Sequence, residues 1–335
     1  MTLVTKTMSN KVEHTRRQAF VLSQDRTGWH LPGIPKWLHW GLLFLLPLFA
    51  AGNILVTKLV SLPAEAWTWN IQIGALIGAV LLVPVNWGLE SFKWAELLPW
   101  GRMEKRAREV LYGTAWSLIG PFRLGAGIGR VSAVRQSERN MAMRAFATSC
   151  AAQWWCTVTA AGIALLLADF TLAGTTVMLM SVVSLALYFG WTPSFWRYLK
   201  SSPLCGNWGL SRKIAKVRRR RALSLSIARF TVMLGQFILL LNAFGHLASL
   251  THPLDRIISQ AEGAALTWGL TSLAPMPAFG DLGLREAAAL WAMQTANHLD
   301  VTAIVGATLT LWVINILIPA MVGLVWQWSA LRKVG

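Results

Sequence analysis

Two Pro/Gly-rich stretches that carry arginine interrupt an otherwise apolar chain, at similar points in its two halves. The first runs from Pro121 to Arg130 and the second from Pro275 to Glu286. Backbone that is not helical cannot face lipid, because its N–H and C=O groups would lack partners there. Such breaks are tolerated only inside protein or along a water-filled cavity. Paired breaks in corresponding positions of two halves are typical of a transporter site.

The composition around the breaks is that of a polytopic membrane protein. Hydrophobic residues make up 55% of the chain and charged residues only 13%. The chain also has 19 tryptophans, many at the ends of apolar runs, where an aromatic belt would lie. The net charge of +17 does not indicate nucleic-acid binding, because the basic residues lie between apolar runs and fit loops that face anionic lipid headgroups.

An apolar segment of about 20 residues can cross a bilayer as a helix. Six such spans are expected, at residues 37–59, 68–90, 147–168, 172–191, 223–247 and 303–327. Three further segments are too short or too interrupted to span, at residues 107–120, 258–274 and 284–297. We interpret these three as half-helices of two re-entrant hairpins, so the expected fold is all-α with six spans and an inverted repeat. The alternative is that the breaks are simply loops with turn residues.

The distribution of Lys and Arg predicts the orientation of the chain. With a cytoplasmic N-terminus, the inner segments hold 27 of the 31 Lys and Arg residues. Those segments are residues 1–36, 91–146, 192–222 and 328–335. The first break then lies on the cytoplasmic side and the second on the outer side, as an inverted repeat would require.

The domain organisation follows from this orientation. A cytoplasmic N-terminal tail, 1–36, precedes a transmembrane domain, 37–327, and a cytoplasmic C-terminal tail, 328–335, follows it. The transmembrane domain divides into a first half, 37–191, a basic cytoplasmic loop, 192–222, and a second half, 223–327. We do not expect the polar, charged N-terminus to be a cleavable signal peptide. The expected location is a bacterial cytoplasmic (inner) membrane.

The arginines and glycines of the two breaks are the expected substrate-binding residues. Glycine allows close backbone approach and unusual torsions, and arginine offers a planar fork for phosphate oxygens. These candidates are Arg123, Gly125, Gly129, Arg130, Gly280, Gly283, Arg285 and Glu286. We expect Arg285 and Glu286 to open a helix after Gly283, with one facing a cavity and the other locking the hairpin.

Asn86, Glu90 and Lys93 are candidate supporting residues at the inner end of the second span. Their spacings of four and three residues place them on one helix face. Glu90 and Lys93 can form an ion pair, which lowers the cost of holding charge near the membrane. The alternative to a role in the site is an ordinary ion pair at the membrane interface.

Arg229 and Glu262 are the other candidate supporting residues. Arg229 lies in the fifth span and can act as a counter-ion for Glu262 or Glu286. It can also extend its side chain to the inner membrane face, and this second interpretation is the one that we favour.

Catalytic, nucleotide-binding and metal-ligating motifs are missing from the sequence. The three cysteines lack zinc-site spacing, and neither HExxH, Gly-x-Ser-x-Gly nor a Walker motif occurs. We therefore expect a protein that is not an enzyme and that uses no metal or cofactor.

The sequence resembles the transmembrane region of the lysylphosphatidylglycerol synthase/flippase-like family. The resemblance rests on Asn86 to Trp94, on Pro121 to Arg130, and on Gly280 to Glu286, which a span with Asn315 and Pro319 follows. The last of these motifs is the most specific, and the match covers about residues 40–330. The resemblance implies movement of lipids, or of lipid-linked sugars, across the bilayer.

The chain departs from that family pattern in two ways. It has Gly125-Ala126 where the family has Gly-Glu, which leaves a proton- or cation-coupled role for this position without its carboxylate. We also expect no soluble aminoacyl-transfer domain like that of the full synthases, so the resemblance does not imply lysyl transfer.

These observations lead to the hypothesis of a flippase-like lipid translocase. Its substrate would be an anionic phospholipid or a polyprenyl-phosphate-linked lipid, with the headgroup held by Arg123, Arg130 and Arg285. Two alternatives stay open. One is a non-catalytic membrane subunit of an envelope complex, with a protein partner or as a homo-oligomer. The other is an accessory to an enzyme that acts on a lipid-linked glycan.

Overall fold

A computed structural model describes residues of one compact unit of the chain, Pro47–Gly335. The described residues are 71–98, 101–118, 124–190, 214–245, 252–273, 281–297 and 301–331. Their secondary structure is helical, and no strand occurs among them. The predicted N-terminal tail, 1–36, and the predicted first span, 37–59, lie outside the described residues, as does most of the basic loop 192–222.

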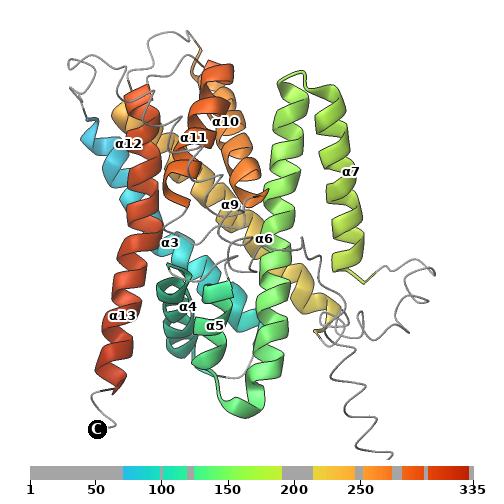
Figure 1. Cartoon of the computed structure of the whole chain (residues 1–335), viewed down its shortest axis with the longest axis vertical. Helices are drawn as coiled ribbons and strands as arrows, with labels where there is room; N and C mark the ends of the chain where they lie inside the picture. Colours follow the sequence, from blue (N-terminus) through green and yellow to red (C-terminus); the bar gives the residue numbers. More distant parts are fainter. Residues whose placement is uncertain are drawn as a thin grey trace, which may run out of the picture. The chain divides into compact units, whose positions relative to one another are not determined.

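Five described helical stretches are long and apolar enough to cross a membrane, and they support the expected all-α membrane protein. The first four are α3 (Ile73–Leu97), α6 (Arg139–Leu167, extended by a short 3-10 turn before it), α7 (Thr171–Tyr188) and α9 (Lys216–Phe244). The fifth joins α12 (Val301–Trp312), a π-helical turn (Val313–Leu317) and α13 (Ile318–Leu331). These five stretches overlap the five predicted spans that fall among the described residues (Figure 1).

Four shorter or less apolar helices form two helical hairpins. They are α4 (Met103–Ser117), α5 (Leu124–Ser132), α10 (Pro253–Leu273) and α11 (Asp281–Asn297). Helix α4 packs against α5, and α10 packs against α11. The predicted half-helices at 107–120, 258–274 and 284–297 are confirmed as helices, with bounds shifted by a few residues.

The first break is shorter than the sequence predicts. We expected non-helical backbone from Pro121 to Arg130, but α5 begins at Leu124 and includes all three glycines. None of these glycines has a positive φ, so unusual torsions are not their role. Two of them instead let neighbours approach closely, since Gly127 lies against the Phe146 ring and Gly129 against α4. Tertiary contact therefore overrides the low helix propensity of glycine here.

The second break matches its prediction more closely. Leu282 has extended torsions (φ −64°, ψ 136°), and Gly283 has φ 85°, a value that favours glycine. The regular helix resumes after Gly283, as expected. The Glu286 carboxylate accepts a 2.5 Å hydrogen bond from the Gly283 backbone N–H. Gly283 is the N-cap of the regular helix and Glu286 is its third residue, so this bond is half of a capping box. Glu286 thereby holds the backbone of the break in place at the start of the helix.

The described flanks of the two breaks meet in one small hydrophobic cluster. Leu118, just after α4, is buried there with Ala115, Trp312 and Ala320, and Leu282 packs against the same group. The chain thus brings its two interruptions close together although they are far apart in sequence.

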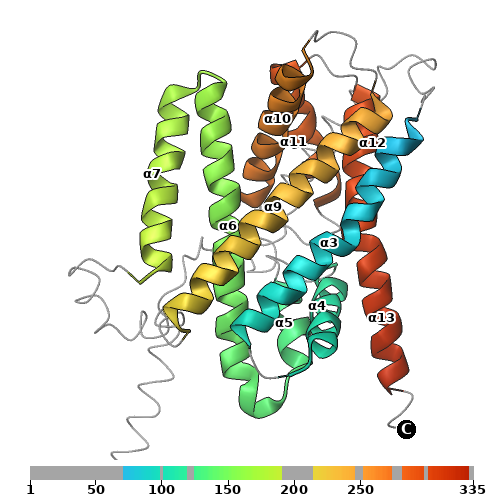
Figure 2. The same ribbon diagram turned by 180° about the vertical axis from the view of Figure 1, so that it is seen from behind.

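A larger hydrophobic cluster holds the longest helices together. Helices α3 and α9 lie side by side (Figure 2). The cluster includes Ala79 of α3, Phe237 and Leu240 of α9, Leu290 of α11 and Ile304 of α12, all almost fully buried. Because residues of both halves share it, the two halves form one packed body and not separate bundles.

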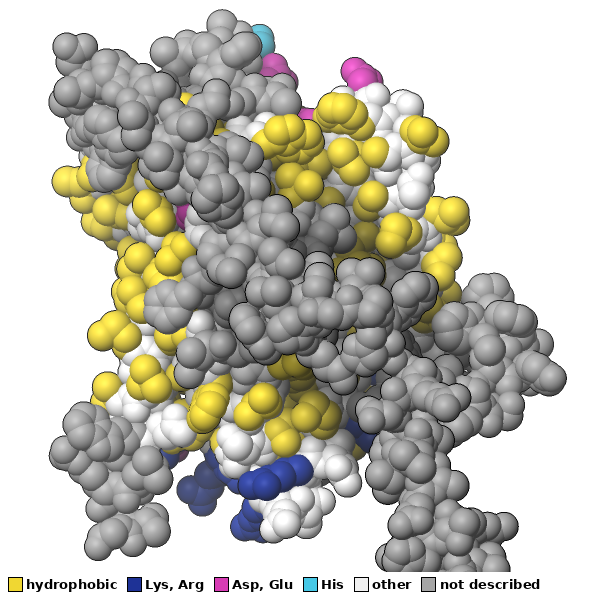
Figure 3. Space-filling model, in the orientation of Figure 1, with side chains coloured by type: hydrophobic (Ala, Val, Ile, Leu, Met, Phe, Trp, Pro, Cys, Tyr) yellow, Lys and Arg dark blue, Asp and Glu magenta, His cyan; other side chains and the backbone are white. Residues whose placement is uncertain are grey.

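Charged side chains are distributed unevenly between the two ends of the described unit. In the face shown in Figure 3, Lys and Arg side chains gather at one end, and Asp and Glu side chains lie toward the other. Exposed basic residues near the start of α4 and the α5–α6 connection include Arg102, Arg108, Arg135 and Arg139. This asymmetry agrees with the uneven Lys/Arg distribution seen in the sequence.

The α4–α5 contact yields a stability prediction. A Cβ at Gly129 would lie 2.7 Å from the Tyr112 carbonyl oxygen and 2.9 Å from Gly113 Cα. Backbone on both sides cannot move away cheaply, so Gly129→Ala should destabilise the fold by about 1–3 kcal/mol. Thermal unfolding in detergent measures the loss. The matched control is Gly88→Ala in α3, where nothing lies within 4 Å of the added Cβ. Equal melting temperatures for the two variants would contradict the prediction.

Candidate functional site

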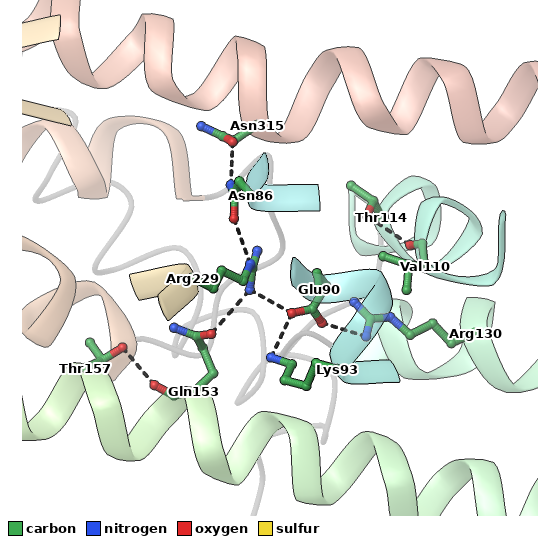
Figure 4. Close-up of polar contacts among 10 residues, drawn as sticks. All are labelled: Asn86, Glu90, Lys93, Val110, Thr114, Arg130, Gln153, Thr157, Arg229 and Asn315. Carbon is green, nitrogen blue, oxygen red and sulfur yellow. Dashed lines mark hydrogen bonds and ion pairs between the residues drawn. The ribbon is translucent and has the colours of Figure 1, made fainter. Parts of the chain in front are cut away.

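Helix α3 presents three polar side chains to the interior of the unit, as the spacing of Asn86, Glu90 and Lys93 predicts. Their exposed fractions are 1%, 3% and 1%. Lys93 Nζ lies 2.7 Å from Glu90 Oε2, which confirms the predicted pair. Both side chains are buried inside the described unit (Figure 4).

Two arginines from other helices join Glu90. Arg130 Nη1, from α5, donates a 2.8 Å hydrogen bond to Glu90 Oε1. Arg229 Nη1, from α9, lies 3.1 Å from Glu90 Oε2. One carboxylate is thus shared by Lys93, Arg130 and Arg229, and we call these four side chains the Glu90 cluster (Figure 4).

The Arg130 guanidinium is held in a defined position by aromatic rings and by a glycine. Its Cζ lies 5.5 Å from the centre of the Trp94 ring and 5.7 Å from that of Phe146, at cation–π distance. Gly113 of α4 leaves room for its stem, because a Cβ there would lie 2.6 Å from Arg130 Cγ. Arg130 Nε is buried without a hydrogen-bond partner among the described residues.

A second buried ion pair fixes the ring that lies against Arg130. Arg106 Nη1 donates a 2.5 Å hydrogen bond to Glu109 Oε2, and both side chains are almost fully buried. The same Glu109 oxygen accepts a 2.8 Å hydrogen bond from Trp94 Nε1. Helix α4 is therefore tied to α3, and the orientation of Trp94 depends on that tie.

Arg229 does not extend to the membrane face, so the interpretation favoured from the sequence is wrong. Its Nε donates a 2.8 Å hydrogen bond to Asn86 Oδ1, and its Nη1 donates a 3.4 Å hydrogen bond to Gln153 Oε1 of α6. Packing of α9 against α3 brings Arg229 to the level of Glu90, with which it forms an ion pair. With 18% of its side chain exposed, Arg229 is the most accessible member of the cluster.

A chain of amide groups extends the cluster into the second half. Asn86 Nδ2 donates to Asn315 Oδ1 at 2.6 Å, and Asn315 Nδ2 donates to Gln236 Oε1 at 3.3 Å. Gln236 Nε2 in turn donates to the Ala79 carbonyl at 3.1 Å. This chain links α3, α9 and the π-helical turn, and it satisfies the buried amides.

The π-helical turn that carries Asn315 has a local cause. Pro319 follows Asn315 by four residues, has no N–H for that carbonyl, and would clash with it in a regular α-helix. The wider turn relieves the conflict. Such single π turns inside α-helices recur at functional sites. The sequence marked Asn315 only through the family resemblance, and the contribution of Gln153 was missed.

The other predicted site residues lie on α5, α10 and α11 or outside the described residues. Arg285 and Glu286 are buried on α11, with Glu286 in the capping role already described. Gly125 is buried in α5, and the space at Gly129 is filled by α4. Glu262 lies on α10, while Arg123 and Gly280 lie outside the described residues. The structure therefore brings Arg130 together with the supporting residues of α3 and α9.

The Glu90 cluster has the electrostatics of an anion site. Its four side chains carry a formal charge of +2, and three of them are at least nine-tenths buried. Charge held away from water is costly unless it is paired, so like charges in this position attract a further anion. Arg and Lys are donors only, which suits phosphate or carboxylate oxygens. Within the described part of the chain, no group of three or more His, Cys, Asp or Glu residues is arranged to hold a metal ion.

Removing the one carboxylate of the cluster should destabilise the protein strongly. Glu90→Gln leaves three buried cations facing one another, so a loss of about 3–5 kcal/mol in unfolding free energy is expected. Combining it with Lys93→Met, which removes one of those cations, should recover part of the loss. The control is Glu96→Gln, because Glu96 pairs with Arg221 on the surface. Thermal unfolding in detergent measures all three, and a Glu90→Gln loss no larger than the control would refute the prediction.

Comparisons with known proteins set no further constraint on this site. No protein-family model matches the chain, and neither the search of curated proteins nor that of solved structures gave a match.

Proposed function

We propose that this protein binds the anionic headgroup of a lipid inside its membrane domain and moves that lipid across the bilayer. The observation that carries the proposal is the Glu90 cluster, in which three cations converge on one buried carboxylate. A site for a cationic substrate would need the opposite balance of charge.

The position of the cluster supports a lipid as the source of the anion. Glu90 and Arg229 both lie on helices that are long and apolar enough to span a membrane. Charged residues at such positions are costly and typically mark a substrate or ion pathway. A headgroup that enters from the bilayer reaches this level without the whole lipid leaving the membrane.

The two helical hairpins support a translocase over a static binding protein. In the proposed topology there are six spans, two re-entrant hairpins in an inverted repeat, and both termini on the cytoplasmic side of a bacterial inner membrane. Leu118 and Leu282, at the flanks of the two hairpins, pack in one hydrophobic cluster, which supports two re-entrant elements that approach each other. The resemblance to the flippase-like family points to the same activity.

The proposed site differs from the one expected from the breaks alone. Arg130 keeps its role, but Lys93 and Arg229 join it in place of glycine backbone amides. Arg285 enters at the second break, where it would meet the headgroup at a later stage of transfer. Glu90 holds the cations in position when no headgroup is bound, and a phosphate would bind beside it as a further acceptor for them.

Lipid translocation in proteoliposomes tests the proposal. Wild type should move a fluorescent anionic lipid faster than its zwitterionic counterpart, and Arg130→Gln should reduce that rate to the level of protein-free vesicles. Arg221→Gln is the matched control, because Arg221 is 63% exposed and pairs only loosely with Glu96. Arg285→Gln reports whether the second break takes part. If folded wild type moves neither lipid, or Arg130→Gln keeps the full rate while folded, the proposal fails.

A further inference from the structure

We infer that the headgroup recognised at the Glu90 cluster is a phosphomonoester, a phosphate with one organic substituent, and not a phosphodiester. This inference rests on the proposed function and narrows the class of its substrate. It separates lipids such as phosphatidate or a polyprenyl phosphate from those whose phosphate carries a second alcohol. The shared chemistry is a dianionic phosphate with three terminal oxygens.

The charge of the cluster favours a dianion. Lys93, Arg130 and Arg229 carry three positive charges, and Glu90 carries the single negative charge facing them among the four side chains. A phosphomonoester has a charge of about −1.5 to −2 at pH 7, since its second pKa is about 6. A phosphodiester keeps one negative charge. The monoester therefore neutralises the +2 of the cluster, whereas the diester leaves buried positive charge, which is costly.

The arrangement of donors favours three acceptor oxygens over two. The three cations reach Glu90 from α3, α5 and α9, so they surround the carboxylate from different helices (Figure 4). Its two oxygens are shared among three cations, with Oε2 facing both Lys93 and Arg229. A phosphomonoester offers one terminal oxygen to each cation. A phosphodiester has only two such oxygens and would repeat the crowding seen at Glu90.

An unused donor gives independent support. Arg130 is nine-tenths buried, and its Nε lacks a hydrogen-bond partner among the described residues. A buried donor without a partner costs about 1–3 kcal/mol, so it is normally paired in the working state of a protein. An extra phosphate oxygen beside the guanidinium fork would satisfy it. Arg130 Nη1 already donates to Glu90, so satisfying Nε requires an acceptor in addition to Glu90 and not one that replaces it.

A binding experiment separates the two phosphate classes. The protein in phosphatidylcholine nanodiscs is titrated at pH 8 with phosphatidate and with phosphatidylmethanol of identical acyl chains. Phosphatidylmethanol is the methyl diester of the same lipid, so the two differ in the second charge, the third terminal oxygen and one methyl group. Phosphatidate should bind at least about tenfold more tightly, equivalent to about 1.4 kcal/mol. Equal affinity for the two lipids would overturn the inference.

Charge variants at Arg229 test the physical cause. Arg229→Gln lowers the formal charge of the cluster to +1. The preference for phosphatidate over phosphatidylmethanol should therefore fall to about twofold or less, well below the tenfold preference (about 1.4 kcal/mol) expected of wild type. Arg229→Lys keeps the charge and should keep the preference, while Arg221→Gln on the surface should change neither. A preference that survives in a folded Arg229→Gln protein would overturn the charge argument. Arg229→Lys behaving like Arg229→Gln would do the same.

Soluble competitors identify the source of the phosphate. Inorganic phosphate and glycerol 3-phosphate carry the same dianion without acyl chains, and they should displace phosphatidate only at far higher concentrations. Displacement at comparable concentrations would assign the site to a soluble phosphate and overturn the lipid part. Failure of both phosphatidate and phosphatidylmethanol to bind would instead refute the proposed function itself. The two failures are therefore distinguishable.

Discussion

The buried carboxylate of Glu90 is the interaction on which the arrangement of the helices around it depends. Three cations reach it from α3, α5 and α9, and each would be costly to bury at this depth without it. The pair between Arg130 and Glu90 attaches the nine-residue helix α5 to a membrane-length helix, although α5 is too short to span or to be stable alone. The positions of α5 and α9 are thus set by charge as well as by apolar contact.

The irregular features of the fold serve this same cluster. Gly113 and Gly129 let α4 and α5 approach closely, which brings Arg130 to Glu90. The π-helical turn before Pro319 places Asn315 beside Asn86, whose side chain in turn orients Arg229. Each feature lowers local helix stability, and each is compensated by a buried polar contact. This pattern is expected where function, and not packing alone, determines the sequence.

Local patterns in the sequence predicted the elements of the fold but not how its charges meet. Apolar runs located α3, α6, α7 and α9, because their length is fixed by bilayer thickness. The spacing of Glu90 and Lys93 predicted their pair, since helix geometry is local. Glu90 and Arg229 are far apart in sequence, and no local pattern links them. The sequence alone therefore could not show that the Arg229 side chain turns to an internal partner and not to the membrane face. The helix at α5 was missed for a related reason, because glycine indicates a break unless a neighbouring backbone is known to need the space.

In the proposed function, headgroup binding and helix movement are coupled by the same ion pair. A phosphate that binds Arg130 beside Glu90 shares the guanidinium with it, and so weakens the bond between α5 and α3 that Glu90 provides. Leu118, at the described flank of the first break, and Leu282 of the second break belong to one hydrophobic cluster, so a shift of the α4–α5 hairpin would change the packing around α11. A ligand shifts a conformational equilibrium only through contacts that differ between the states. The sharing of one arginine between phosphate and Glu90 is such a difference, and it links substrate charge to movement of the hairpin.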